Sequence, residues 1–425
     1  MDDPSSSQPR SGIGGQLIGM VSAPRLVKAA TRTGGFATAS ILRAVQVSRK
    51  YPEVPVPPPT LGRLASVFAE ELMVLGMATV DDLARDREAL ARISRETDEA
   101  LETFASHGWD ADPIRYHRTP SAPEIFDVEE RECRGLGIRQ LSFDSGFEPA
   151  PELPGGKNWL SHPNNRRCYA NVLEHADGPR PWLVLLHGFA MGTPIDLRVM
   201  RAASYHNSLG FNVLAVILPL HGPRRTNQRE IGGTGLVSLD WMANVHGLTQ
   251  AVWDVRRCLA WIRERGATSI AIHGMSLGGY TAALVAGLEA DLACVVAGVP
   301  SATIHTPLVG AYRRNPRLRR TLDSFDLLGD RAARIHRVVT PTAFTCQIGR
   351  ERRFIYAGTA DRLATPNQPY LLWDHWDRPS ICWTQRSHMF TMMSADVRRF
   401  VRNAVVSTAN APEGVPELTA TAMAT

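Results

Sequence analysis

Between residues 132 and 405, short apolar runs alternate with longer segments in which apolar positions recur every three or four residues. The short runs, bounded by Gly, Pro and Asn, predict β-strands, and the longer segments predict amphipathic helices. The predicted strands are Ile138–Phe147, Arg167–Leu173, Trp182–Leu186, Phe211–Leu218, Ser269–Ile272, Cys294–Val299, Phe354–Ala357 and Ile381–Thr384. Short, largely apolar strands separated by helices predict an α/β fold with a mainly parallel sheet covered by helices on both faces.

The helical segments of this region follow from the same periodicity. Asp196–Leu209 and Gln250–Arg265 are each followed directly by a glycine, which is a common helix stop, and Ser276–Gly287 follows a predicted strand. The segment from about 300 to 353 is longer than one crossover helix needs to be. We therefore expect a cap insertion there, after the sixth predicted strand.

The pattern differs outside residues 132–405. Residues 61–131 have apolar positions at helical spacing and predict an α-helical N-terminal extension. Residues 1–60 are rich in Ser and Gly, end in a proline-rich run and predict a flexible basic arm. Residues 406–425 are polar and predict a disordered tail.

The net charge of +5 is confined to the arm, because residues 1–51 carry seven basic and two acidic residues. The remainder of the chain is balanced, which argues against a nucleic-acid-binding face. Two interpretations of the arm stay open. It is either a segment drawn to anionic lipid at a membrane surface or an arm packed loosely on the domain.

The chain lacks the signals of export and of metal binding. No apolar run approaches the ~18 residues of a membrane span, and the N-terminus has no signal-peptide pattern. A cytoplasmic protein is expected, with peripheral membrane contact through the arm as the other interpretation. The six cysteines form no C-x-x-C pair and no zinc spacing, so we expect neither a metal nor an organic cofactor.

The strongest chemical signal is Gly274-Met275-Ser276-Leu277-Gly278, a G-x-S-x-G sequence between a buried strand and a helix. In this context the sharp turn strains the serine backbone and lifts Oγ above the sheet, while the glycines let strand and helix approach closely. The helix N-terminus also favours a developing negative charge. The pattern predicts Ser276 as a nucleophile, and the alternative is a tight turn without chemistry.

A serine hydroxyl needs a base to become nucleophilic. Asp361 and His388 each lie on a loop just past a predicted strand, at the sheet edge where open α/β folds place their sites. We expect Ser276 to attack, His388 to serve as general base and then acid, and Asp361 to orient the imidazole. Asp374-His375-Trp376-Asp377 offers side chains that could bind a metal, but it precedes the last predicted strand and is typical of a helix.

The loop His187-Gly188-Phe189 follows the strand Trp182–Leu186 and predicts part of an oxyanion hole. The backbone N–H groups of Phe189 and Leu277 are the expected donors. His187, Gly188 and Met275 are the expected substrate-contacting residues. For His187, a role in bracing the loop is the competing interpretation.

In this order, His187-Gly188-Phe189, Gly274–Gly279, Asp361 and His388 resemble the motifs of the α/β-hydrolase superfamily. The resemblance covers residues 132 to 405, about two thirds of the chain. Leu218–Arg225 also resembles a less-studied branch of α/β-hydrolase-domain proteins thought to act on acyl esters or lipids.

The resemblance implies a serine hydrolase that cleaves a carboxylic ester through an acyl-enzyme and needs no cofactor. The expected partner is a small-molecule acyl ester or lipid, not nucleic acid. Because one fold hosts many activities, an acyltransferase and a peptidase stay open. A different class also stays open, namely a catalytically silent scaffold that binds a membrane or a partner.

Overall fold

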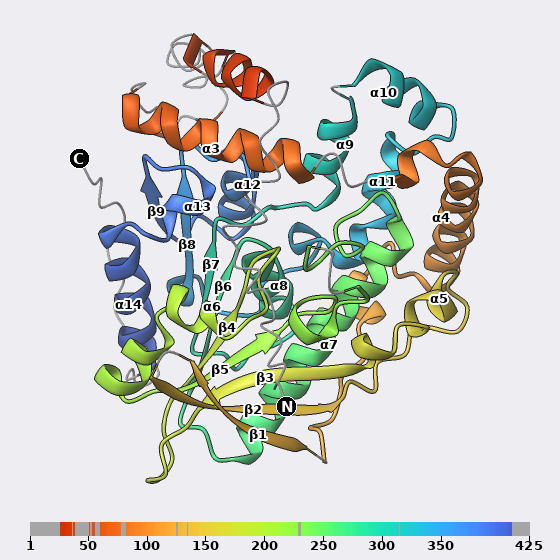
Figure 1. Cartoon of the computed structure of the whole chain (residues 1–425). Helices are drawn as coiled ribbons and strands as arrows, with labels where there is room; N and C mark the ends of the chain where they lie inside the picture. Colours follow the sequence, from red (N-terminus) through yellow and green to blue (C-terminus); the bar gives the residue numbers. More distant parts are fainter. Residues whose placement is uncertain are drawn as a thin grey trace, which may run out of the picture. The chain divides into compact units, whose positions relative to one another are not determined.

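A computed structural model of the chain is described over residues 26–35, 37–38, 51, 53–55, 60–77, 82–124, 126–133, 135–227, 231–313 and 315–409 (Figure 1). The chain divides into two compact units, Met1–Val80 and Asp81–Thr425. The first unit contains a helical stretch at 26–35 and helix α3 (Leu61–Met77). Most of the predicted arm and nearly all of the predicted tail lie outside the described residues. Within the described ranges, no helix is both long enough and apolar enough to span a bilayer.

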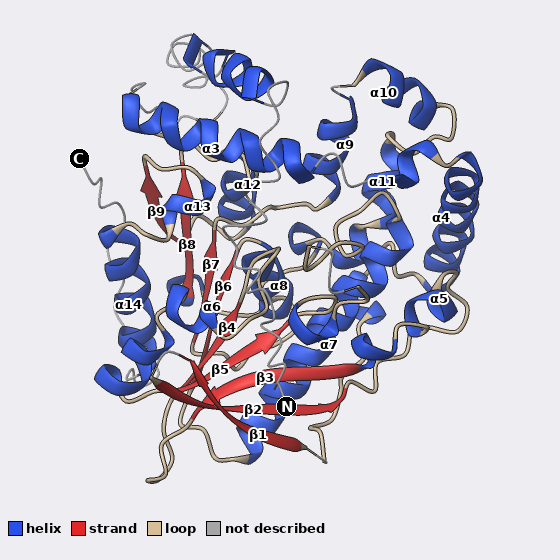
Figure 2. Cartoon of the chain, in the orientation of Figure 1, coloured by secondary structure: helices blue, strands red, loops and turns tan. Residues whose placement is uncertain are grey.

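The second unit is built on one nine-stranded sheet with the order β1-β2-β3-β5-β4-β6-β7-β8-β9 (Figure 2). The strands are β1 (Asp127–Cys133), β2 (Leu136–Asp144), β3 (Arg167–Leu173), β4 (Trp182–Leu186), β5 (Asn212–Ile217), β6 (Ile270–Met275), β7 (Cys294–Gly298), β8 (Arg353–Gly358) and β9 (Ser380–Thr384). From β5 to β9 all neighbours are parallel, whereas β1, β2 and β3 pair antiparallel. The mainly parallel sheet is therefore confirmed.

The side chains of the central strands alternate between two hydrophobic cores. In β4, Val184 and Leu186 enter the first core, while Leu183 and Leu185 enter the second. Because each face has its own core, the strand must be apolar at every position. This explains why β4 has no polar alternation in its sequence.

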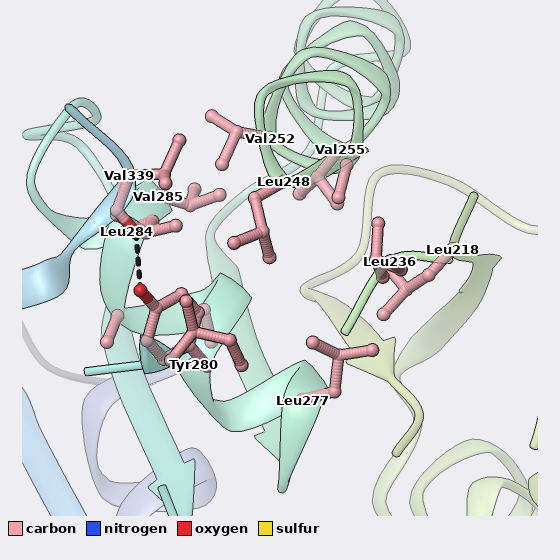
Figure 3. Close-up of a cluster of buried hydrophobic side chains, with 14 of the residues drawn as sticks. Leu218, Leu236, Leu248, Val252, Val255, Leu277, Tyr280, Leu284, Val285 and Val339 are labelled. Atoms are coloured by element: carbon pink, nitrogen blue, oxygen red, sulfur yellow. Dashed lines mark hydrogen bonds between the residues drawn. The ribbon is translucent and has the colours of Figure 1, made fainter. Parts of the chain in front are cut away.

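Helices cover both faces, as expected. The first core includes residues of α4 (Arg87–His107), α7 (Trp241–Glu264), α8 (Leu277–Ala286) and α12 (Asn367–His375). The second includes residues of α6 (Ile195–Val199) and α14 (Ala395–Ala409). Figure 3 shows part of the first core, where the Tyr280 hydroxyl donates to the Val339 carbonyl oxygen at 2.6 Å. The remaining short helical elements are η1 (Asp82–Arg85), η2 (Pro113–Tyr116), α5 (Gly156–Leu160), η3 (Pro163–Arg166), η4 (Ser204–Ser208), η5 (Gly222–Arg224), η6 (Arg337–Val339), η7 (Pro341–Ala343), η8 (Arg350–Arg352) and α13 (His388–Thr391).

The predicted insertion at 300–353 contains helices α9 (His305–Arg313), α10 (Pro316–Asp323) and α11 (Asp330–Ile335). It follows the seventh strand rather than the sixth, because β1 was not predicted. The residues of β1 are mostly charged and exposed, so this edge strand has no apolar pattern. The predicted helical extension 61–131 is shared between the units, since α4 packs against α7 and α11 of the second unit.

Two helices differ from their predictions. The prediction of a single helix at 196–209 is wrong. It is split into α6 and the π-helical turn η4, because Arg201 adopts φ 60° and ends the first helical segment. The helix expected from Gln250 begins at Trp241, because the Asp240 carboxylate accepts from the Ala243 N–H and caps it.

Candidate active site

Ser276 lies in the turn between β6 and α8 with φ 56° and ψ −116°. This backbone conformation is strained for any residue with a side chain. The turn is held on both sides: the Ser276 N–H donates to the Gly298 carbonyl at 2.8 Å, and its carbonyl accepts from the Tyr280 N–H at 2.8 Å. The strain is therefore maintained by the neighbouring strand and by the helix itself.

The glycines around Ser276 are required by close backbone packing. A Cβ atom added to Gly274 would lie under 3.0 Å from the Gly278 carbonyl oxygen. One added to Gly279 would lie 2.7 Å from the Gly298 oxygen, and real Cβ atoms do not come this close. Helix α8 can therefore begin directly above the ends of β6 and β7 only because these positions lack side chains.

Ser276, His388 and Asp361 form one hydrogen-bonded chain. His388 Nε2 lies 2.8 Å from Ser276 Oγ, and His388 Nδ1 lies 2.7 Å from Asp361 Oδ2. The other Asp361 oxygen accepts from the N–H groups of Leu363 and Ala364 at 2.9 and 2.8 Å. With both carboxylate oxygens engaged, the imidazole is held with Nδ1–H toward Asp361 and the Nε2 lone pair toward Ser276.

Burial increases along the hydrogen-bonded series from Ser276 through His388 to Asp361. Asp361 is 3% exposed and His388 is 8% exposed, while Ser276 is half-buried. A carboxylate in a buried position interacts more strongly with its neighbours than one in water. The accessible end of the chain is therefore the hydroxyl that would meet a substrate.

Two backbone N–H groups beside Ser276 suit a developing anion. Leu277 is the first residue of α8, so its N–H has no acceptor within the helix. The Phe189 N–H has no acceptor among the described residues. A Cβ atom added to Gly188 would lie 3.4 Å from both Ser276 Cβ and Met275 Cε, so this loop lies against the serine.

His187 braces this loop through its imidazole ring. Its Nδ1 bonds to the Gly188 carbonyl at 2.8 Å, and its Nε2 accepts from the Leu218 N–H at 3.1 Å. Burial lowers the pKa of His187, so the ring is neutral. With both ring nitrogens in use, the structure favours the bracing interpretation over substrate contact through the ring, whereas Gly188 and Met275 do lie beside Ser276.

Residues 183–417, more than half of the chain, match the family described as the Alpha/beta hydrolase family. The chain belongs to this family. Two uncharacterized proteins of Mycobacterium tuberculosis, from strains CDC 1551 / Oshkosh and H37Rv, are each 39% identical to it over 361 residues. These alignments cover 83% of this chain and 84% of each relative.

Two solved structures are similar to this alpha/beta hydrolase. Acetyl xylan esterase 1 from Thermoanaerobacterium sp. JW/SL YS485 superimposes with a TM-score of 0.48 and 15% identity, covering 71% of this chain and 93% of that one. An acetyl xylan esterase from Paenibacillus sp. R4 gives a TM-score of 0.47 and 16% identity, covering 70% and 98%.

Three loops of the alpha/beta hydrolase pack against one another beside the candidate oxyanion hole, namely 187–192, 218–225 and 231–236. The Ala190 N–H donates to the Gly232 carbonyl at 2.9 Å, which joins the 187–192 loop to the 231–236 loop. A Cβ atom on Gly192 would lie 2.7 Å from the Cβ of His221, and one on Gly233 would lie 2.7 Å from its Cε1. His221 thus fills the space between the loops. The sequence pattern indicated no role for His221, although the motif Leu218–Arg225 contains it.

Arg224 of the same motif forms a buried ion pair with Asp254 of α7. Arg224 and Asp254 are 2.8 Å apart, with side-chain exposures of 0% and 1%. Arg224 also donates to the Ile217 and Asn165 carbonyls, each at 3.0 Å. Asp254 accepts from the Ser145 hydroxyl at 2.5 Å, and burial raises the pKa of its carboxyl group. This network attaches the 218–225 loop to α7.

The acidic candidates weighed for metal binding have other partners. Asp374 pairs with Arg378 at 2.9 Å, and Asp377 with Arg353 at 3.5 Å. His375 Nε2 donates to the Phe344 carbonyl at 2.7 Å. His375 thus attaches the end of α12 to the segment that carries Phe344.

Proposed function

We propose that this protein is a serine hydrolase that cleaves a carboxylic ester through an acyl-enzyme intermediate. The single observation that carries the proposal is the hydrogen-bonded chain from Asp361 through His388 to Ser276 Oγ, at a strained strand–helix turn. Nucleophile, base and orienting acid each have the neighbour that their role requires.

In the first half-reaction, Ser276 Oγ attacks the ester carbonyl carbon while His388 Nε2 takes the hydroxyl proton. The imidazolium that forms is stabilised by the Asp361 carboxylate, which accepts the Nδ1–H hydrogen bond. When the tetrahedral intermediate collapses, the C–O bond to the alcohol breaks. His388 Nε2 returns its proton to the leaving oxygen, and Ser276 is left acylated.

The negative charge of the tetrahedral intermediate would be bound by the N–H groups of Leu277 and Phe189. Both belong to segments held rigidly by backbone packing, so little reorganisation is needed as the charge develops. Loss of one such donor typically costs about 10²–10³ in turnover.

In the second half-reaction, water donates a proton to His388 Nε2 and attacks the acyl carbonyl. Collapse of the second intermediate releases the carboxylic acid and returns the proton to Ser276 Oγ. An acyltransferase would use a bound alcohol in place of this water, and a peptidase would release an amine in the first step. The silent-scaffold alternative would use none of these steps.

The test is hydrolysis of p-nitrophenyl esters from acetate to palmitate by the wild type and by Ser276→Ala. We expect the variant to lose at least about 10³-fold in turnover, and the preferred chain length to report the depth of the acyl pocket. Matching anilides would identify a peptidase, and ester formation with an added alcohol would identify a transferase. No turnover, together with no fluorophosphonate labelling of Ser276, would overturn the proposal in favour of the scaffold.

A further inference from the structure

A concave site lies beside α7, at the edge of the first core. Thr249, Val252, Trp253 and Arg256 of the helix line it, and Val252 also belongs to that core, as do the lining residues Tyr116 and Phe147. The remaining walls come from η2 with the preceding turn and from the loop after β2. None of its lining residues belongs to the loops that carry Ser276, Asp361 and His388. We propose that this pocket binds a small planar aromatic monocarboxylate.

The size of the pocket limits its ligand. Its volume is about 150 Å³. An apolar cavity of about this volume holds one benzene-sized molecule. A single aromatic ring with a short substituent therefore fills this volume, whereas a nucleotide or a long acyl chain would extend beyond it.

The walls present ring surfaces rather than polar atoms. Trp109 and Tyr116 pack edge to face with centroids 5.2 Å apart, as do Phe147 and Trp253 at 6.3 Å. The Trp253 indole N–H donates to the Ser145 carbonyl at 2.7 Å. The Tyr116 hydroxyl is hydrogen-bonded to the Thr249 hydroxyl at 3.3 Å. With these polar groups already engaged, the walls favour a flat apolar ligand that can stack or pack edge-on.

The charged side chains that line the pocket indicate which polar group its ligand carries. Arg256 is neutralised by Glu289 at 2.5 Å, and Arg118 lies over the Trp253 ring, 5.3 Å from its centroid. Arg115 is exposed, and its guanidinium has no hydrogen-bond or ion-pair partner among the described residues.

Glu148 is the one acidic residue among the lining residues. Glu289, the partner of Arg256, also pairs with Arg263, which pairs with Asp291. The three lining arginines and Arg263 thus face three carboxylates, and one positive charge is in excess. A monoanion matches this excess, and a dianion does not. A guanidinium fork binds a carboxylate in a bidentate manner, which makes Arg115 the expected partner.

The experiment uses two probes of nearly equal size, benzoate and benzyl alcohol, titrated into the full-length protein. Binding is followed by calorimetry and by intrinsic fluorescence, since Trp109 and Trp253 both line the pocket. We expect saturable binding of both, with benzoate about tenfold tighter because of its charge-assisted contact. Arg115→Leu should remove that difference, and Ala150→Trp, which fills the pocket from its wall, should remove binding of both.

The matched control is Arg198→Leu, which removes another exposed arginine, on α6, and should leave both affinities unchanged. Retention of benzoate affinity in Ala150→Trp, or absence of saturable binding in the wild type, would overturn the proposal. Should Ala150→Trp not fold, the Arg115→Leu comparison decides alone, because an unchanged preference for benzoate contradicts the assignment. Fluorophosphonate labelling of Ser276 in the same variants separates this result from the fate of the proposed hydrolase activity.

Discussion

The carbonyl oxygen of Leu186 occupies the space into which a side chain on Gly278 would project. A Cβ atom built on Gly278 would lie under 3.0 Å from that oxygen, so the second residue of α8 rests on the end of β4. This contact brings the Leu277 N–H and the 187–189 loop to the same side of Ser276. The absence of a side chain at Gly278 thus allows the strand–helix turn to pack against the candidate oxyanion hole.

Replacing Gly278 with Ala should therefore damage both the fold and the site. Alanine normally stabilises a helix by about 1 kcal/mol relative to glycine, but here its methyl group would displace the β4 backbone. We expect a lower denaturation midpoint and at least a hundredfold loss of ester turnover. Gly137→Ala is the control, because no atom lies within 4 Å of its added Cβ, and it should change stability by less than about 0.5 kcal/mol. A fully active and stable Gly278→Ala variant would contradict this account.

The strain at Ser276 predicts a reversed order of stability between Ser276→Gly and Ser276→Ala. Both variants lack Oγ, so the comparison isolates the backbone. At an ordinary position glycine is the less stable residue by about 0.5–1 kcal/mol. At φ 56°, we expect glycine to be the more stable by about 1 kcal/mol, measured by urea denaturation. If Ser276→Ala were instead more stable than Ser276→Gly, the turn would not be strained.

The buried pair Arg224–Asp254 should be far more sensitive to charge removal than an exposed pair. Asp254→Asn would leave the Arg224 guanidinium buried without its counter-charge, at a cost of about 3–5 kcal/mol. The matched control is Asp323→Asn, because Asp323 and Arg319 are 3.3 Å apart with side chains 47% and 61% exposed. That change should cost less than about 1 kcal/mol. Equal effects in chemical denaturation would refute the anchoring role of the buried pair.

Stability should fall on mild acidification because histidines withdrawn from solvent, among them His117, His273 and His336, resist protonation. Burial lowers the pKa of His117 and of His273 to about 4, and that of His336 to about 3. In the unfolded chain these groups titrate near a pKa of about 6.5, so the unfolded state binds more protons below that pH. Their contribution to stability is thus complete above about pH 6.5. It declines toward pH 4 by about 1.4 kcal/mol per pH unit for each histidine.

Denaturation midpoints measured from pH 7.5 to pH 5 test this dependence. His117→Gln should reduce the pH dependence of stability by the contribution of one histidine. Glutamine does not titrate, and it can still donate to the Val338 carbonyl as His117 Nε2 does. A variant with the slope of the wild type would show that His117 titrates alike in both states.

Local sequence pattern was sufficient wherever an element's environment is uniform. Strands β3 and β4 were predicted to the residue, and β4, which is buried on both faces, is apolar throughout. The positions of Ser276, Asp361 and His388 past strand ends were also readable, and the structure brings the three side chains together. Pattern failed at β1, where an exposed edge strand has no apolar signal, and at Arg201, where a left-handed residue divides a periodic segment.

The sequence by itself determined the alternation of strands and helices, the turn around Ser276 and the order of the three candidate catalytic residues. These depend on spacing along one stretch of chain, and short-range sterics and periodicity act on that scale. Only the tertiary structure decided that His187 braces a loop, that His221 fills the space between three loops, and that Arg224 meets Asp254. Each of these depends on contacts between segments distant in the chain, which are fixed by close packing and carry no spacing signal.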